Sequence, residues 1–299
     1  MQGRSAGLYN LERMDTVSAE REYHRITEER LSRFGRILQQ QEYSWGTVEN
    51  YIRSVRAFRA WHHGGFDKCQ VLAWKAQLVS CCAPATVNAM LAGINCFFRF
   101  QGWEDCVVKP LRLQRRSFSA PERELNKSEY FRLVKAARGA GKERLALVME
   151  TICATGLRVS EVPYITLEAA VDGKAEIALK GKIRTILLPG KLCRKLLRYA
   201  RARNITSGRL FLTRSGRPLS RVQIWSEMKR LCRTAGVPES KVFPHNLRHL
   251  FAKTFYLLYR DIVKLADILG HSSINTTRLY LLTDGSEHIR KLEHMHLLC

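Results

Sequence analysis

Apolar residues recur every three or four positions along most of the chain, which is the spacing of helices that bury one face. Residues 1–19 show no such period and are expected to form a loose leader. Three helices are predicted next, one within 20–41, one after the N-cap Ser44 and one from Pro84. Their predicted buried positions are Ile26, Leu31, Phe34, Ile37, Leu38, Val48, Ile52, Val55, Phe58, Val87, Met90, Leu91, Ile94, Phe97 and Phe98. We therefore expect an all-helical domain over residues 20–106.

The helical period stops in the middle of the chain. Residues 107–124 hold two prolines and several basic residues without hydrophobic periodicity, which predicts an extended basic linker. Helical spacing returns after it, with Asn126 or Ser128 as the first N-cap. A second domain is therefore expected over residues 125–299.

A short β pattern interrupts the second domain. Residues 175–179 and 184–188 alternate between apolar and polar side chains, and the turn Lys180-Gly181-Lys182 joins them. We interpret the preceding Asp172-Gly173 pair as a further hairpin turn. Helical spacing resumes after Pro189. The predicted class is mainly α with a small antiparallel β-sheet, divided into two domains.

Charge narrows the class of partner. The chain has 50 Lys and Arg against 27 Asp and Glu, a net charge of +23, while 45% of its residues are hydrophobic, which excludes a disordered basic tail. Most of the excess lies in residues 123–299. Nucleic acid is the partner that best neutralises such a domain. A ribosomal-type or membrane-surface protein is the alternative, and spread charge disfavours the membrane surface.

The sequence also argues against membrane and secreted classes. No stretch of 18 apolar residues lacks a charge, and the N-terminus has no continuous apolar segment of a signal peptide. The nine cysteines include no C-x-x-C pair, which suits reduced thiols. We expect a cytoplasmic protein without a membrane partner.

Four segments contain side chains that can bind a phosphate or react with it. They supply, in chain order, Arg158, Lys180, His245, Arg248, His271 and Tyr280. Arg158 is expected beside a helix N-terminus, where backbone N–H groups attract anions. His245 and Arg248 are three residues apart and share one helix face. Each segment alone also has an ordinary reading as a helix start, a solvated turn, a cap or a core aromatic.

A metal site is another reading of His245 and His249, which are four residues apart. A hydrolytic zinc helix carries Glu directly after its first histidine, and Asn246 stands there instead. We therefore expect no metal and no cofactor.

Together and in this order, the four segments resemble the boxes of the tyrosine recombinases, the phage-integrase and Xer-like family. The resemblance rests on ATGLRVSEV at 154–162, HNLRHLFA at 245–252 and LGHSSINTTRLY at 269–280. In the first domain, the S-x-x-T-x-x-x-Y pattern of Ser44, Thr47 and Tyr51 resembles the family's helical core-binding domain.

The resemblance implies a core-binding domain and a catalytic domain that form a C-shaped clamp on DNA. It implies strand exchange through a 3′-phosphotyrosine, with Tyr280 as the nucleophile, His245 as the base and neither metal nor ATP. Arg158, Arg248 and His271 would bind the phosphate. Lys180 would protonate the leaving 5′ hydroxyl, although the family hairpin is longer and Lys182 stays an alternative.

The resemblance further implies partners. These are double-stranded DNA with a short inverted-repeat core site and further copies of the chain, as a dimer on one site and a tetramer in synapsis. Such a protein is encoded by a bacterium, a phage or a mobile element. A helix at about 285–299 would dock into a neighbouring protomer or pack on its own domain.

Other basic residues are candidates for DNA contacts. They are Arg53, Arg56, Arg59, Lys109, Arg115, Arg116, Lys182 and Arg184. The row of Arg53, Arg56 and Arg59 is either a DNA-facing strip or a solvated helix face. A type IB topoisomerase and a non-catalytic DNA-binding regulator are the alternative functions.

Overall fold

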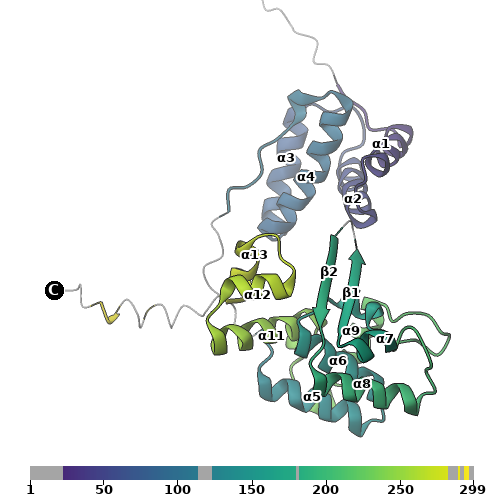
Figure 1. Ribbon diagram of the computed structural model, residues 1–299. Helices are drawn as coiled ribbons and strands as arrows, with labels where there is room; N and C mark the ends of the chain where they lie inside the picture. The colour runs from purple at the N-terminus through teal and green to yellow at the C-terminus, as the bar shows by residue number, and fades with distance from the viewer. Residues whose placement is uncertain (1–22, 114–122, 180–181, 282–288, 290–292, 296–299) are drawn as a thin grey trace, which may run out of the picture. The chain divides into compact units, whose positions relative to one another are not determined.

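The computed structural model describes residues 23–113, 123–179, 182–281, 289 and 293–295. They divide into two compact units, with the division between Gln114 and Arg115 (Figure 1). Helices make up most of both units, and one two-stranded antiparallel sheet lies in the second unit. This confirms the predicted fold class. Among the described helices, none has both the length and the apolar character of a membrane span.

The first unit is a bundle of four helices followed by one short 3₁₀ turn. They are α1 (Glu28–Gln40), α2 (Trp45–Trp61), α3 (Lys68–Cys81), α4 (Pro84–Gln101) and η1 (Glu104–Cys106). The side chains of Thr27, Ser44 and Asp67 accept hydrogen bonds from backbone N–H groups at the starts of α1, α2 and α3. The predicted N-cap at Ser44 is confirmed. Helix α3 was not predicted.

Aromatic rings fill the core of the first unit. Phe58 contacts Phe66, Trp74 and Phe98 edge to face, with ring centroids 5.0, 5.2 and 6.3 Å apart. Most of the predicted core positions are buried, whereas Ile26, Ile37, Ile52 and Met90 are only half-buried.

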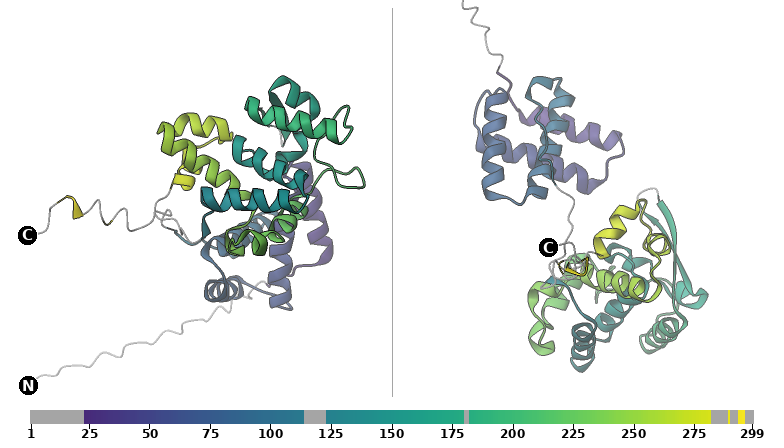
Figure 2. Two further views of the ribbon diagram at one scale, coloured as in Figure 1. Left: turned by 90° about the horizontal axis from the view of Figure 1, so that it is seen from below. Right: turned by 90° about the vertical axis from the view of Figure 1, so that its left-hand side faces the viewer.

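The second unit begins with helices and returns to helices after its hairpin (Figure 2). The elements before the sheet are α5 (Lys127–Gly139), α6 (Glu143–Thr155), η3 (Val159–Tyr164) and α7 (Leu167–Asp172). Those after it are α8 (Gly190–Ala202), α9 (Arg221–Lys229), α10 (Cys232–Ala235), η4 (Glu239–Lys241), α11 (Pro244–Tyr259), α12 (Ile262–Leu269), α13 (Ile274–Arg278) and η5 (Leu279–Leu281). Helix α6 contacts α5, α8 and α11, so it is the central element of this core.

The predicted hairpin is present, with strands β1 (Lys174–Leu179) and β2 (Lys182–Leu187). Their register pairs Ile177 with Arg184. The interpretation of Asp172-Gly173 as a hairpin turn was wrong. Gly173 ends α7 instead, in the left-handed conformation with φ 73°. An Asp-Gly pair fits both turns, because glycine supplies the positive φ that each needs.

Candidate active site

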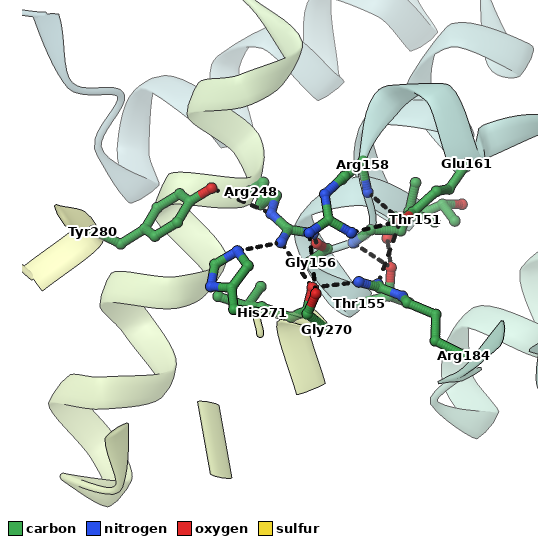
Figure 3. A network of polar contacts seen from close by, with 12 residues as sticks. Thr151, Thr155, Gly156, Arg158, Glu161, Arg184, Arg248, Gly270, His271 and Tyr280 are labelled. Atoms are coloured by element: carbon green, nitrogen blue, oxygen red, sulfur yellow. Dashed lines mark hydrogen bonds and ion pairs between the residues drawn. The ribbon is translucent and has the colours of Figure 1, made fainter. Parts of the chain in front are cut away.

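Arg158, Arg184, Arg248, His271 and Tyr280 meet on the second unit, although they are spread over more than a hundred residues (Figure 3). They come from the ends of η3 and α12, from strand β2, from helix α11 and from turn η5. Three guanidinium groups and the imidazole of His271 therefore share one region with the phenol of Tyr280.

Arg248 lies at the centre and only 2% of it is exposed. Its guanidinium donates to the carbonyl oxygens of Gly156 and, at 2.8 Å, Leu269, at the C-termini of α6 and α12. Carbonyls at a helix C-terminus lack partners within the helix and carry partial negative charge, so a cation is stabilised there. Gly156 adopts φ 66° to end α6, and a Cβ there would lie 2.5 Å from Phe251.

Arg158 is the accessible arginine of the cluster. Its side chain is 40% exposed. It donates from Nη1 to Oε1 of Glu161 at 3.0 Å and from Nη2 to the carbonyl of Gly270 at 3.2 Å. Oε2 of Glu161 also accepts from the backbone N–H of Arg158 at 2.7 Å. The buried Glu161 therefore orients Arg158 from two sides, and sequence reasoning did not single it out.

Arg184 lies inside the cluster, whereas we expected it to face DNA. Its Nη1 donates to the carbonyl of Leu269, and its Nη2 lies 3.4 Å from Oε2 of Glu161. Burial is the main cause that lowers the pKa of Arg184. Its Nε and Nη2 are buried without a hydrogen-bond partner among the described residues, although Nη2 keeps its ion pair with Glu161.

His271 connects Arg248 to helix α13. Nη2 of Arg248 lies 2.8 Å from Nε2 of His271, and Nδ1 lies 2.8 Å from Oγ1 of Thr277. Because a guanidinium only donates, Nε2 accepts and the proton is assigned to Nδ1. Burial, followed by the charges of Arg248, Arg158 and Arg184, lowers the pKa of His271 to about 4. The ring is therefore neutral at pH 7.

Tyr280 is buried, with its ring among three histidines. The ring centroids of His245, His249 and His271 lie 5.5, 5.2 and 5.6 Å from that of Tyr280. Its hydroxyl accepts from Nε of Arg248 at 3.4 Å. The phenol oxygen therefore already contacts the cationic cluster.

The two histidines of α11 have different surroundings. His245 is exposed at the surface, yet partial burial and the nearby His249 and Arg248 lower its pKa. His249 is half-buried, and a hydrogen bond with the backbone of Leu279 opposes the lowering of its pKa by burial. His249 was considered only as half of a metal pair, and its position beside Tyr280 was missed.

The remaining predicted site residues belong to the first unit or are not fully described. Lys180, Arg115 and Arg116 are outside the described residues, and only the backbone of Lys182 is described. Arg53 and Lys109 are exposed on the first unit. Arg56 and Arg59 both pair with Glu28, at the start of α1. Whether this row contacts DNA stays a prediction.

Comparison with known proteins gives the family. A model of the phage integrase family matches residues 123–286, more than half of the chain. Tyrosine recombinase XerD of Xanthomonas axonopodis pv. citri is 30% identical over 285 residues, covering 84% of this chain and 90% of its own. Tyrosine recombinase XerA of Pyrococcus furiosus is 29% identical over 220 residues, covering 71% of this chain and 75% of its own.

Solved structures share the fold. A lambda integrase tetramer bound to a Holliday junction gives a TM-score of 0.69 at 18% identity, covering 84% of this chain and 76% of that one. The Tn1549 transposon integrase in complex with transposon right end DNA also gives 0.69, at 15% identity, covering 90% of this chain and 99% of that one. With the geometry above, these findings show that the chain belongs to the phage integrase family, as a tyrosine recombinase.

Proposed function

We propose that the protein cleaves and rejoins DNA strands at a specific site through a 3′-phosphotyrosine intermediate, with Tyr280 as the nucleophile. The observation that carries this proposal is the hydrogen bond between the Tyr280 hydroxyl and Arg248, inside a cluster of three arginines. The same reaction serves integration, excision, inversion or resolution, depending on how the target sites are arranged.

The cluster supplies the electrostatics that this reaction needs. A phosphodiester carries one negative charge, and attack by an oxygen nucleophile adds a second at the same phosphorus. Fixed donors aimed at that charge are usually the largest catalytic contribution. Arg158 offers a partly exposed guanidinium, and Arg184 offers a buried Nε that no described residue satisfies. Glu161 pairs with both Arg158 and Arg184. Because its single negative charge faces the three positive charges of the arginines, the cluster keeps a net positive charge.

Proton transfer involves groups on either side of the phosphate. A free phenol has a pKa of about 10, so Tyr280 needs a base or a cationic site to react at neutral pH. His245, whose ring contacts that of Tyr280, is the proposed base, and Arg248 stabilises the phenolate. Lys180, or Lys182 as the alternative, is the proposed acid at the leaving 5′ hydroxyl.

A nicked suicide DNA substrate carrying the target site tests the proposal. We expect a covalent protein–DNA adduct with the wild-type chain and none with Tyr280→Phe. Tyr259→Phe is the matched control, since Tyr259 is 65% exposed, and it should form the adduct normally. An adduct that survives Tyr280→Phe would contradict the assignment. Relaxation of supercoils without recombinant products would indicate a topoisomerase instead.

We further propose assembly into a dimer on one DNA site and a tetramer during synapsis. An apolar pocket of about 710 Å³ on the second unit supports this proposal. Phe131, Leu187, Leu258 and Tyr259 line it and are exposed. Its proposed occupant is the C-terminal segment of a second copy, which lies mostly outside the described residues and in whose sequence Ile289, Leu292, Met295 and Leu298 recur every three residues. The cytoplasm is the proposed location, where free thiols persist.

A further inference from the structure

Two segments of the first unit bring a histidine, a carboxylate and a thiol together. His24 lies before α1 and pairs with Phe66 in an antiparallel bridge, with both backbone N–H···O distances 2.9 Å. Asp105 and Cys106 belong to η1, which follows α4. The proposed recombination chemistry uses none of these three residues.

Two of the three distances between the candidate ligand atoms are those of a tetrahedral metal centre. Nε2 of His24 lies 3.3 and 3.2 Å from the two carboxylate oxygens of Asp105. Sγ of Cys106 lies 3.4 Å from Oδ2 of Asp105, and the three ligand atoms all lie within 4.8 Å of one another. Zinc bonds of about 2.0–2.3 Å place tetrahedral ligands about 3.3–3.7 Å apart. An ion entering the cluster would therefore find two of the three ligand pairs already at tetrahedral spacing.

Packing holds the ligands in place before any ion binds. The imidazole of His24 stacks on Trp103 with centroids 4.6 Å apart and an interplanar angle of 20°, and its edge contacts Phe66. Cys106 is fully buried, whereas the side chain of Asp105 is 59% exposed. The thiol and the imidazole are therefore largely buried, and the exposed carboxylate is the side from which an ion and a water molecule can approach.

We propose that His24, Asp105 and Cys106 bind one zinc-class divalent ion, with water as the fourth ligand. One imidazole, one carboxylate and one thiolate favour Zn²⁺ or Co²⁺ over Mg²⁺ and Ca²⁺, which prefer oxygen ligands. Binding displaces the thiol proton of Cys106 to solvent. The thiolate, the carboxylate and the divalent ion then sum to zero charge, which suits a half-buried position.

The bound ion would fasten the chain at residue 24 to the end of α4. The described contacts of His24 with the rest of the unit include one backbone bridge, one ion pair and ring contacts with Trp103 and Phe66. A metal bond adds a stronger link at the same point. The three ligands form no sequence motif, because residue 24 is more than eighty positions from the other two and no short spacing joins them.

Titration of the full, chelator-treated chain with Co²⁺ tests the site. We expect one equivalent to bind, with a thiolate-to-cobalt charge-transfer band and the visible bands of a tetrahedral ion. Zn²⁺ should displace the colour and raise the melting temperature. Cys106→Ser should abolish the charge-transfer band. Asp105→Asn, at an exposed position that leaves the fold intact, should weaken Co²⁺ binding at least tenfold.

The matched control is the double variant Cys81→Ser/Cys82→Ser. These neighbouring thiols have sulfur atoms 3.6 Å apart and are another place where a soft ion could bind. They lie outside the proposed site, so the double variant should bind Co²⁺ as the wild type does. If the wild type binds no ion, or the control variant alone loses binding, the cluster is only an ion pair beside a buried thiol. DNA cleavage plays no part in this readout, so it stands or falls separately from the proposed function.

Discussion

Arg158 and Arg248 both carry a guanidinium, but they differ in burial and in the number of hydrogen bonds that they make within the protein. Arg248 is 2% exposed and bonds two helix-terminal carbonyls, His271 and Tyr280. Arg158 is 40% exposed and bonds Glu161 and one carbonyl. Loss of either side chain should abolish catalysis, whereas loss of Arg248 should lower the stability of the fold more than loss of Arg158.

We predict that Arg158→Ala and Arg248→Ala both abolish adduct formation, while only Arg248→Ala lowers the melting temperature strongly. Each buried partner left unsatisfied costs about 1–3 kcal/mol. For a domain of this size that corresponds to a drop of several degrees, at about 2–4 °C per kcal/mol. Thermal unfolding and DNA binding, measured beside the suicide-substrate assay, check this. Equal melting temperatures would contradict the structural role of Arg248.

His271 gives the protein a pH dependence of known sign. Its ordinary pKa is 6.5, and the folded chain lowers it to about 4. Between these values the unfolded chain binds a proton that the folded chain does not, so stability falls as the pH falls through this window. We predict that melting temperature declines less steeply from pH 6.5 to 4 in His271→Asn than in the wild type. The slope should not vanish, because His245 and His249 are shifted in the same direction. An unchanged slope would contradict the burial of the neutral ring.

At the scale of elements, the turn after α12 decides whether the cluster can form. Gly270 has φ 63°, and a Cβ there would lie 2.5 Å from Nη1 of Arg184. We predict that Gly270→Ala displaces Arg184 and reduces cleavage at least tenfold, beyond the backbone strain of about 1–2 kcal/mol. Gly216→Ala is the control, since Gly216 has φ 73° and an added methyl group would meet no described atom within 4 Å. Equal loss of cleavage in both variants would show that backbone strain alone is responsible.

Helix α3 was not predicted, and the pattern of its apolar residues gives the physical reason. Helix α3 buries Val71, Trp74 and Leu78, but Leu72 and Val79 are exposed, so the apolar positions do not form one clean stripe. The hairpin and most helices were predictable because caps and alternation are local signals.

The sequence predicted the residues of the candidate site better than the hydrogen bonds and ion pairs between them. Strand alternation places Arg184 on the same side as the buried Ile186, which was a signal available in the sequence. The i,i+3 spacing of Arg158 and Glu161 was a local signal for their pairing, whereas the second pairing of Glu161, with Arg184, was not available because it depends on segments that meet in three dimensions. Long-range meetings of this kind leave no spacing in the chain.

For the molecule as a whole, the proposed chemistry separates into cleavage by one chain and exchange between chains. We predict that Leu258→Glu leaves adduct formation on the suicide substrate unchanged but reduces recombination between two full sites at least tenfold. Leu258 is 69% exposed and lines the apolar pocket, so a carboxylate there costs the monomer little and opposes an apolar occupant. Val222→Glu, at a position 63% exposed on α9 and outside the pocket lining, is the matched control. Normal recombination by Leu258→Glu would contradict the proposed exchange.

The hydrogen bonds from Arg248 to the ends of α6 and α12 also affect which site residues can be lost when a descendant of this protein loses its catalytic activity. A descendant that abandons strand transfer but still needs a stable body for occupying DNA can lose the nucleophile with little structural consequence. It cannot discard Arg248 as readily, because two helix ends would lose their shared partner. Inactive descendants of this chain are therefore expected to keep Arg248 and to have changed Tyr280 or Arg158, so an intact central arginine is poor evidence that a relative is still an enzyme.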